Sequence, residues 1–193
     1  MKRLTVVVLA ALALPAVLPA QQPAPANSAN PVTQAFTASG RRYAGWLMAA
    51  FDSIPASKYG YRPTPIQMTV GNVAQHLESA NYSLCSGFGG MPHAMTARDS
   101  LADSIKAQWP KDTLTARLRA SFAFCDAALA TLDDGKMGDM IPAGPPGSGR
   151  TAARARFVLG YVTDLVDHWS QVANYMRLNG LVPPSALPRP AAR

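Results

Sequence analysis

The chain has 193 residues, a formal net charge of +7 at pH 7 and 48% hydrophobic residues. This length suits one domain that builds a full hydrophobic core without depending on several disulfides. The arginines and lysines are scattered, with no dense basic run and no alternation of basic with aromatic residues. These patterns exclude the usual nucleic-acid-binding classes, and we expect no nucleic-acid partner.

Residues 1–20 show the order of features that is typical of an export signal. Lys2 and Arg3 give a basic start, residues 4–17 form an apolar run, and Ala20 offers a small residue for cleavage. The run is short for a membrane span, and a buried helix is the alternative. No later segment is apolar enough to cross a membrane. We therefore expect an exported protein, periplasmic or secreted, without membrane contact after the signal is removed.

The first half of the remaining chain predicts a spacer and two helices. Residues 21–31 are rich in Pro, Ala and Asn and predict a disordered spacer. Apolar residues at helical spacing then predict a helix over residues 32–53. Prolines and a glycine make residues 54–68 a connection. Thr69 is a good N-cap for a second helix over residues 70–88, which a group of glycines ends.

The second half of the chain carries two more helical patterns. Residues 89–111 form a longer irregular connection that can hold a short helix. Asp112 is the expected N-cap of a third helix over residues 113–132. A loop rich in Gly and Pro at 133–149 precedes a fourth helix over residues 151–179. We find no convincing strand.

Four long amphipathic helices in one domain predict an all-α fold, a four-helix bundle over residues 32–185. A loose tail rich in Pro, Ala and Arg follows at residues 186–193. Cys85 and Cys125 fall near the buried sides of the second and third helices. In an exported protein the two can form a disulfide, which leaves neither thiol free as a nucleophile. Two buried free thiols are the alternative.

Three polar residues beside the apolar stripes form a candidate metal site. His76 lies in the second helix, while Asp164 and His168 are four residues apart in the last helix and so share one face. If the two helices pack, two imidazoles and a carboxylate converge, a ligand set that divalent metals accept. The alternatives are an ordinary core histidine and a metal-free hydrogen-bond network. His93 lies in a loop with no placed partner, and we expect it to be exposed. Asp167 lies toward the flank of the last helix, where we expect it to be solvated, with support of the metal ligands as the alternative.

Several motifs resemble those of the DinB/YfiT-like superfamily of metal-binding four-helix-bundle proteins. They are YRPTP at 61–65, VAQHL at 73–77, the segment 164–180 with the two prolines after it, and SFAFC at 121–125 together with Cys85. The sequence YMRLNGLVPP at 175–184 is especially similar to exported members. The resemblance covers residues 32–185 and implies helices in up-down-down-up order.

The resemblance also implies a metal site of three histidines, one in the second helix and an H-x-x-x-H pair in the last. The first histidine falls on His76, and the second member of the pair falls on His168. The first member of the pair falls on Asp164, a departure that gives a His/Asp/His site. Aspartate favours harder metals and weakens zinc or nickel binding. The expected cofactor is a divalent ion: zinc, nickel, manganese or iron.

Characterised relatives of this kind are thiol-dependent transferases and isomerases, and metal-dependent hydrolases. Their thiol cofactors are cytoplasmic, so an exported chain favours a metal-dependent hydrolase with a small-molecule substrate. No catalytic residue beyond the metal ligands is identified. One alternative is a non-catalytic bundle, metal-free or with a structural metal, that has a binding or stress-related role in the envelope. Another is a thiol-dependent transferase. A homodimer is compatible with each of these functions.

Overall fold

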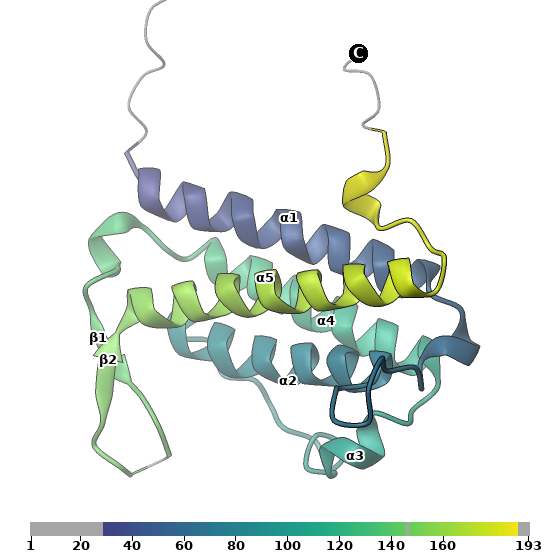
Figure 1. The fold of residues 1–193 in the computed structure, drawn as a ribbon. Helices are drawn as coiled ribbons and strands as arrows, with labels where there is room; N and C mark the ends of the chain where they lie inside the picture. The colour runs from purple at the N-terminus through teal and green to yellow at the C-terminus, as the bar shows by residue number, and fades with distance from the viewer. Residues whose placement is uncertain (1–28, 146, 189–193) are drawn as a thin grey trace, which may run out of the picture.

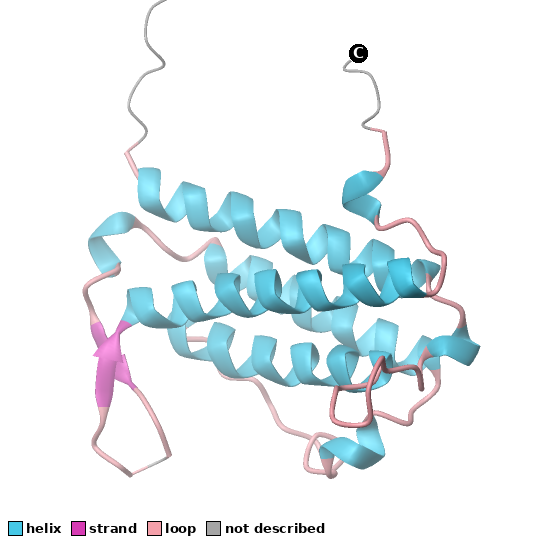
Figure 2. Cartoon of the chain, in the orientation of Figure 1, coloured by secondary structure: helices cyan, strands magenta, loops and turns pink. Residues whose placement is uncertain are grey.

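A computed structural model of the chain describes residues 29–145 and 147–188. Four long helices dominate it, as Figures 1 and 2 show. They are α1 (Pro31–Ser53), α2 (Val70–Gly89), α4 (Lys111–Leu129) and α5 (Arg154–Leu178). The smaller elements are α3 (Asp103–Lys106), η1 (Ala56–Lys58), η2 (Asp134–Lys136), η3 (Pro184–Ala186), β1 (Met140–Pro142) and β2 (Thr151–Ala153). The predicted all-α bundle is confirmed.

Helix α2 shows how the sequence sets these elements. Thr69 caps its start, because the Thr69 hydroxyl oxygen accepts a hydrogen bond from the Asn72 amide at 3.1 Å. At the other end Gly90 adopts the left-handed conformation, with φ at 63°, that commonly stops a helix. Val73 and Leu77, one helical turn apart, are fully buried in the core. The helix that carries His76 is therefore fixed at both ends and along one face.

The helices run up, down, down and up, as the resemblance implied. In Figure 1, α1 and α5 run in one direction and α2 and α4 in the other. The ends meet accordingly: the Lys111 ammonium at the start of α4 donates to the carbonyls of Asp52 and Ile54 at the end of α1. Beyond the end of α4, the Asp134 carboxylate accepts the amide N–H of Thr33 in the first turn of α1. Helix α2 packs on both α4 and α5, so it faces the predicted Asp164–His168 pair.

The parallel pair α2 and α4 needs a connection that returns along the bundle. Residues 90–110 make this return, and α3 lies within it (Figure 1). A Cβ atom added at Gly71 would lie 2.3 Å from the Ala107 carbonyl oxygen, so only glycine lets the connection approach the start of α2 this closely. The predicted cap Asp112 is wrong: α4 begins two residues earlier than predicted, at Lys111 after Pro110, without a side-chain cap. Proline there already holds the extended backbone that precedes a helix.

A small antiparallel hairpin corrects the prediction that the chain has no strand. In β1 and β2, Met140 lies opposite Ala153 and Pro142 opposite Thr151. The fourth helix accordingly begins at Arg154, not at residue 151. Strands of three residues are too short for alternation to be visible in the sequence, and backbone pairing across a Gly/Pro loop holds them instead. The third helix is also shorter than predicted and ends at Leu129.

The predicted pairing of Cys85 with Cys125 is present as a disulfide that joins α2 to α4. Their Cα atoms are 5.2 Å apart, and both residues are fully buried in the core. The alternative of two free thiols does not hold, because both cysteines are oxidised. The parallel helices α2 and α4 are thus linked covalently within the core.

Some predictions concern residues at the ends of the chain. The predicted signal, residues 1–20, lies outside the described residues, as do most of the spacer and most of the tail. Within the described part, α1 starts at the end of the predicted spacer, and η3 reaches the first residue of the predicted tail. No helix in this part has the length and apolar character needed to cross a bilayer.

Candidate metal centre

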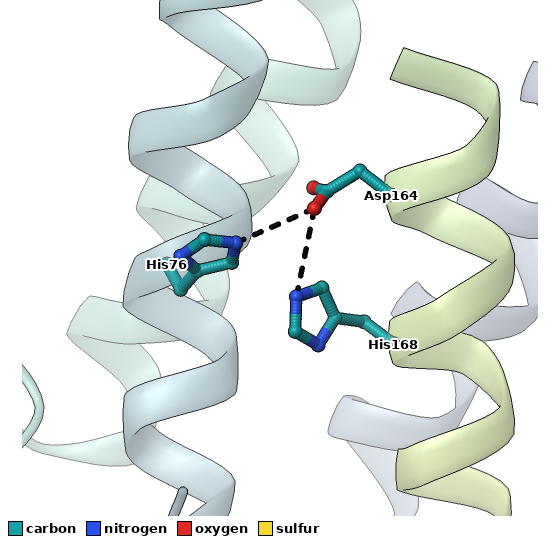
Figure 3. Close-up of side chains that lie close together, drawn as sticks. All are labelled: His76, Asp164 and His168. Atoms are coloured by element: carbon teal, nitrogen blue, oxygen red, sulfur yellow. Dashed lines mark hydrogen bonds and ion pairs between the residues drawn. The ribbon is translucent and has the colours of Figure 1, made fainter. Parts of the chain in front are cut away.

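The structure brings His76, Asp164 and His168 together between α2 and α5 (Figure 3). The Asp164 Oδ1 atom lies 3.4 Å from His76 Nε2 and 3.6 Å from His168 Nε2. The two imidazole rings are 4.7 Å apart between centroids. One potential ligand atom from each residue lies within 4.8 Å of the other two. The three residues therefore converge as the helical spacing predicted, with room for one ion between them.

The group lies at the edge of the core rather than within it. His168 is buried, with a side-chain exposure of 9%, whereas the His76 side chain is 40% exposed. The Asp164 side chain is 24% exposed. His76 therefore forms an open side of the group, and His168 forms its inner wall.

The donor set fits a cation. The hydrogen bond that the Asp164 carboxylate accepts from His76 raises the pKa of His76, although burial acts in the opposite direction. The second carboxylate oxygen of Asp164, Oδ2, is buried and has no hydrogen-bond partner in the part of the chain that the structure describes. A buried carboxylate oxygen without a partner is unfavourable, and a bound cation would satisfy it. The arrangement can therefore hold a divalent ion on two imidazoles and a carboxylate.

Two further residues of α5 support His168, and the predicted site did not include them. His168 Nδ1 lies 2.9 Å from Gln171 Oε1, and the Gln171 amide nitrogen donates to the Tyr175 hydroxyl at 2.8 Å. The Tyr175 hydroxyl in turn donates to the Met68 carbonyl at 2.9 Å. The spacing of three and then four residues from His168 to Gln171 and Tyr175 places them on one helical face, which the sequence alone could have indicated.

The other residues considered from the sequence lie outside the group. His93, which we expected to be exposed, is half-buried and stacks face to face on Tyr82 with 3.6 Å between ring centroids. Asp167 is exposed, as predicted, and its charge adds to the raised pKa of His76. Neither residue is among those that can share an ion with His76 in the described chain.

A polar cavity of about 600 Å³ opens beside His168. Its walls come from α5 and from the segment before α2, and they include Gln67, Asp167, His168, Gln171, Asn174 and Arg177. The cavity gives solvent and small polar molecules a way to the inner imidazole.

The fold and this group define the class of protein: a four-helix bundle with three candidate metal ligands between two of its helices. Residues 44–172 match the family model of the DinB superfamily, and the chain belongs to that superfamily. This result confirms the family that the motifs indicated. No curated protein matches the chain.

Solved structures share the fold. A DinB-like protein from Bacillus cereus ATCC 10987 is 20% identical, with a TM-score of 0.60 over 78% of this chain and 95% of that one. A conserved protein from Enterococcus faecalis is 16% identical, with a TM-score of 0.58 over 76% and 96%. The mycothiol-dependent maleylpyruvate isomerase is 12% identical, with a TM-score of 0.56 over 74% of this chain. The chain spans 60% of that isomerase, and at these identities the likeness concerns the fold alone.

Proposed function

We propose that this protein is an exported member of the DinB superfamily that binds a divalent metal ion and hydrolyses a small-molecule substrate. The observation that carries the proposal is the convergence of ligand atoms from His76, Asp164 and His168 within 4.8 Å. The buried Asp164 oxygen without a partner supports it, because a bound cation would satisfy that atom.

The ligand chemistry limits the choice of metal. Two imidazoles and a carboxylate suit zinc, nickel, manganese and iron(II), and three protein ligands leave coordination positions open. Asp164 stands where the family resemblance implies a histidine, and its harder oxygen favours manganese or iron more than a third imidazole would. The identity of the ion is part of the test.

A divalent ion in such a site polarises carbonyl or phosphoryl oxygens and lowers the pKa of water enough for hydrolysis near neutral pH. The chain contributes the geometry around it. His168 presents Nε2 from the buried wall, and Asp164 supplies a negative charge between the two imidazoles. The exposed side of His76 leaves space for a substrate to approach, whereas the cavity beside His168 is lined by neither His76 nor Asp164.

Export is proposed from the basic, apolar and small-residue order of residues 1–20. The disulfide between Cys85 and Cys125 agrees with an oxidising compartment. In that compartment a thiol-dependent transferase would lack a cytoplasmic thiol cofactor, so hydrolysis is the favoured activity. A non-catalytic bundle in the envelope is the competing function.

The first test is elemental analysis of the mature protein, purified without a metal-affinity tag. We expect about one ion per chain, as for a single three-ligand site. The variant His168→Ala should lose it. The matched control is His93→Ala, because His93 stacks on Tyr82 outside the group, and this variant should keep the ion. Absence of metal from the wild type, even after incubation with zinc, nickel or manganese, would contradict the proposal.

The second test separates catalysis from a structural metal. The protein with its ion, the chelated protein and the reloaded protein are compared on ester, amide and phosphoester substrates. A hydrolase should lose activity on chelation and regain it on reloading. Bound metal without activity on any substrate would favour the non-catalytic bundle.

A further inference from the structure

We propose that Tyr175 and Gln171 are positioning residues that fix the tautomer of His168, so that its Nε2 atom is held unprotonated toward Asp164. The chain of hydrogen bonds runs from the Met68 carbonyl through both residues to the buried imidazole. The assignment of the tautomer stands on these bonds alone. The consequence of this tautomer for metal binding rests on the proposed function.

The Met68 carbonyl determines which group donates and which accepts in each of these hydrogen bonds. A backbone carbonyl can only accept a hydrogen bond, so the Tyr175 hydroxyl must donate its single proton there, at 2.9 Å. Tyr175 is 1% exposed, although it also borders the polar cavity beside His168. Its oxygen is then left to accept a hydrogen bond and not to donate a second one.

Gln171 links the Tyr175 hydroxyl to the His168 imidazole and thereby fixes which imidazole nitrogen donates. Its NH2 group donates to the Tyr175 oxygen at 2.8 Å, which turns its carbonyl oxygen toward His168. That carbonyl oxygen accepts only, so His168 Nδ1, 2.9 Å away, must carry a proton. A neutral imidazole with a proton on Nδ1 has its lone pair on Nε2. Nε2 is the atom that lies 3.6 Å from Asp164 Oδ1.

The hydrogen bonds to Gln171 and Tyr175 are needed because Asp164 favours the opposite tautomer of His168, the one with its proton on Nε2. A carboxylate oxygen beside Nε2 attracts a proton onto that nitrogen, and a protonated nitrogen cannot bind a metal ion. The bond from Nδ1 to Gln171 opposes this and keeps Nε2 available. Partners of this kind on the outer nitrogen of a metal-binding histidine orient the ring and strengthen binding.

The chain of bonds also joins the two helices that supply the ligands. Met68 lies directly before Thr69, the residue that caps α2, and α2 carries His76. Tyr175 lies on α5, seven residues after His168. The same hydroxyl that sets the His168 tautomer thus anchors α5 to the start of α2.

The tautomer can be measured in the metal-free protein by long-range ¹H–¹⁵N correlation of the imidazole groups. The measurement is made at about pH 8.5, above the ordinary histidine pKa of about 6.5. We expect a protonated Nδ1 and an unprotonated Nε2 for His168 in the wild type. A proton on Nε2 would overturn the proposal, and this first measurement requires no variant.

The variant Tyr175→Phe releases Gln171, whose amide can then turn either end toward His168. We expect a mixture of both tautomers and a metal affinity that is about 10- to 100-fold lower, as is usual when such an outer partner is lost. The matched control is Tyr59→Phe, because the buried Tyr59 hydroxyl also donates to a backbone carbonyl, that of Phe51 at 2.8 Å. This control should leave the tautomer and the affinity unchanged.

A second substitution tests whether the effect passes through the tautomer. In the Tyr175→Phe background, Gln171→Glu presents only acceptor oxygens to His168 Nδ1, so the Nδ1-protonated tautomer should return. An unchanged tautomer in Tyr175→Phe, or no recovery in the double variant, would overturn the proposal. The expected tautomers in a protein that binds no metal would support the positioning role, while the proposed function would fail.

Discussion

Asp164 Oδ1 and His76 Nε2 lie 3.4 Å apart, although 88 residues separate them in the chain. The contact exists because α2 packs antiparallel to α5, which turns His76 toward the helical face that carries Asp164 and His168. One ligand therefore comes from one helix and two from another. The geometry of the site depends on how the bundle packs, and not on a local loop.

Placing a histidine at position 164 should change the preference for metals. We expect Asp164→His to raise the affinity for zinc and nickel relative to manganese by about tenfold, because imidazole is a softer ligand than carboxylate. Competition titrations of the metal-free protein measure this ratio. The control is Leu159→His, which adds an imidazole at an exposed position of α5 outside the group and should leave the ratio unchanged. An unchanged ratio in Asp164→His would show that residue 164 does not ligate the ion.

Arg117 holds the returning connection against the bundle. Its guanidinium contacts Glu78 of α2, with N–O distances of 2.6 and 3.0 Å, and Asp99 of the 90–110 connection. The side chains of Glu78 and Asp99 are nearly buried, 5% and 10% exposed. Arg117→Met would leave two buried carboxylates without their cation, which should lower the free energy of unfolding by about 3 kcal/mol.

Urea unfolding measures this loss, and Arg119→Met is the matched control. Arg119 also pairs with an aspartate, Asp52 at 2.9 Å, but both side chains are about half exposed. Exposed pairs of this kind contribute less than about 1 kcal/mol. If the two variants unfold at the same urea concentration, Arg117 does not stabilise the connection in the way its contacts indicate.

Asp99 should make the protein sensitive to acid. Burial of Asp99 favours its neutral form, but hydrogen bonds from Thr96 and the pairing with Arg117 outweigh burial and lower the pKa from 3.8 to about 2. A pKa that is lower in the folded state stabilises the fold above the unfolded value. This stabilisation is lost as the pH falls from about 4 to about 2. Asp99→Asn should therefore lose less stability than the wild type over this range.

The measurement is the free energy of unfolding by urea at several pH values between about 5 and about 2, the range where carboxyl groups titrate. The exposed Asp112 supplies the control, since Asp112→Asn should keep the slope of the wild type. Equal slopes for Asp99→Asn and the wild type would mean that Asp99 does not contribute to the acid sensitivity.

The sequence predicted the long helices and the three converging residues because both depend on regular spacing. The helix predicted over 70–88 is observed as Val70–Gly89, and Thr69 caps it as expected. The same periodicity placed Asp164 and His168 on one face, and it could have added Gln171 and Tyr175. Helical periodicity can be recognised in a single sequence because every residue of a helix has the same local backbone geometry.

Features that depend on distant contacts were not predictable. The hairpin of β1 and β2 is held by backbone pairing, which leaves little trace in side-chain pattern. The sequence places no partner for His93, because nothing local indicates that the 90–110 connection brings it onto Tyr82. The contact of Arg117 with Asp99 likewise follows from the path of that connection. Each of these three contacts joins segments that only the folded structure brings together.

The disulfide between Cys85 and Cys125 should supply a large part of the stability of the mature protein. It closes a loop with a sequence separation of 40 residues and lies fully buried between α2 and α4. In the chain-entropy model a loop of this length contributes about 4 kcal/mol to the free energy of unfolding. Urea unfolding with and without a strong reductant should show a difference of about this size in the wild type. The double variant Cys85→Ala with Cys125→Ala is the control and should not respond to the reductant. A wild type that unfolds at the same urea concentration in both conditions would mean that helix packing alone holds α2 against α4.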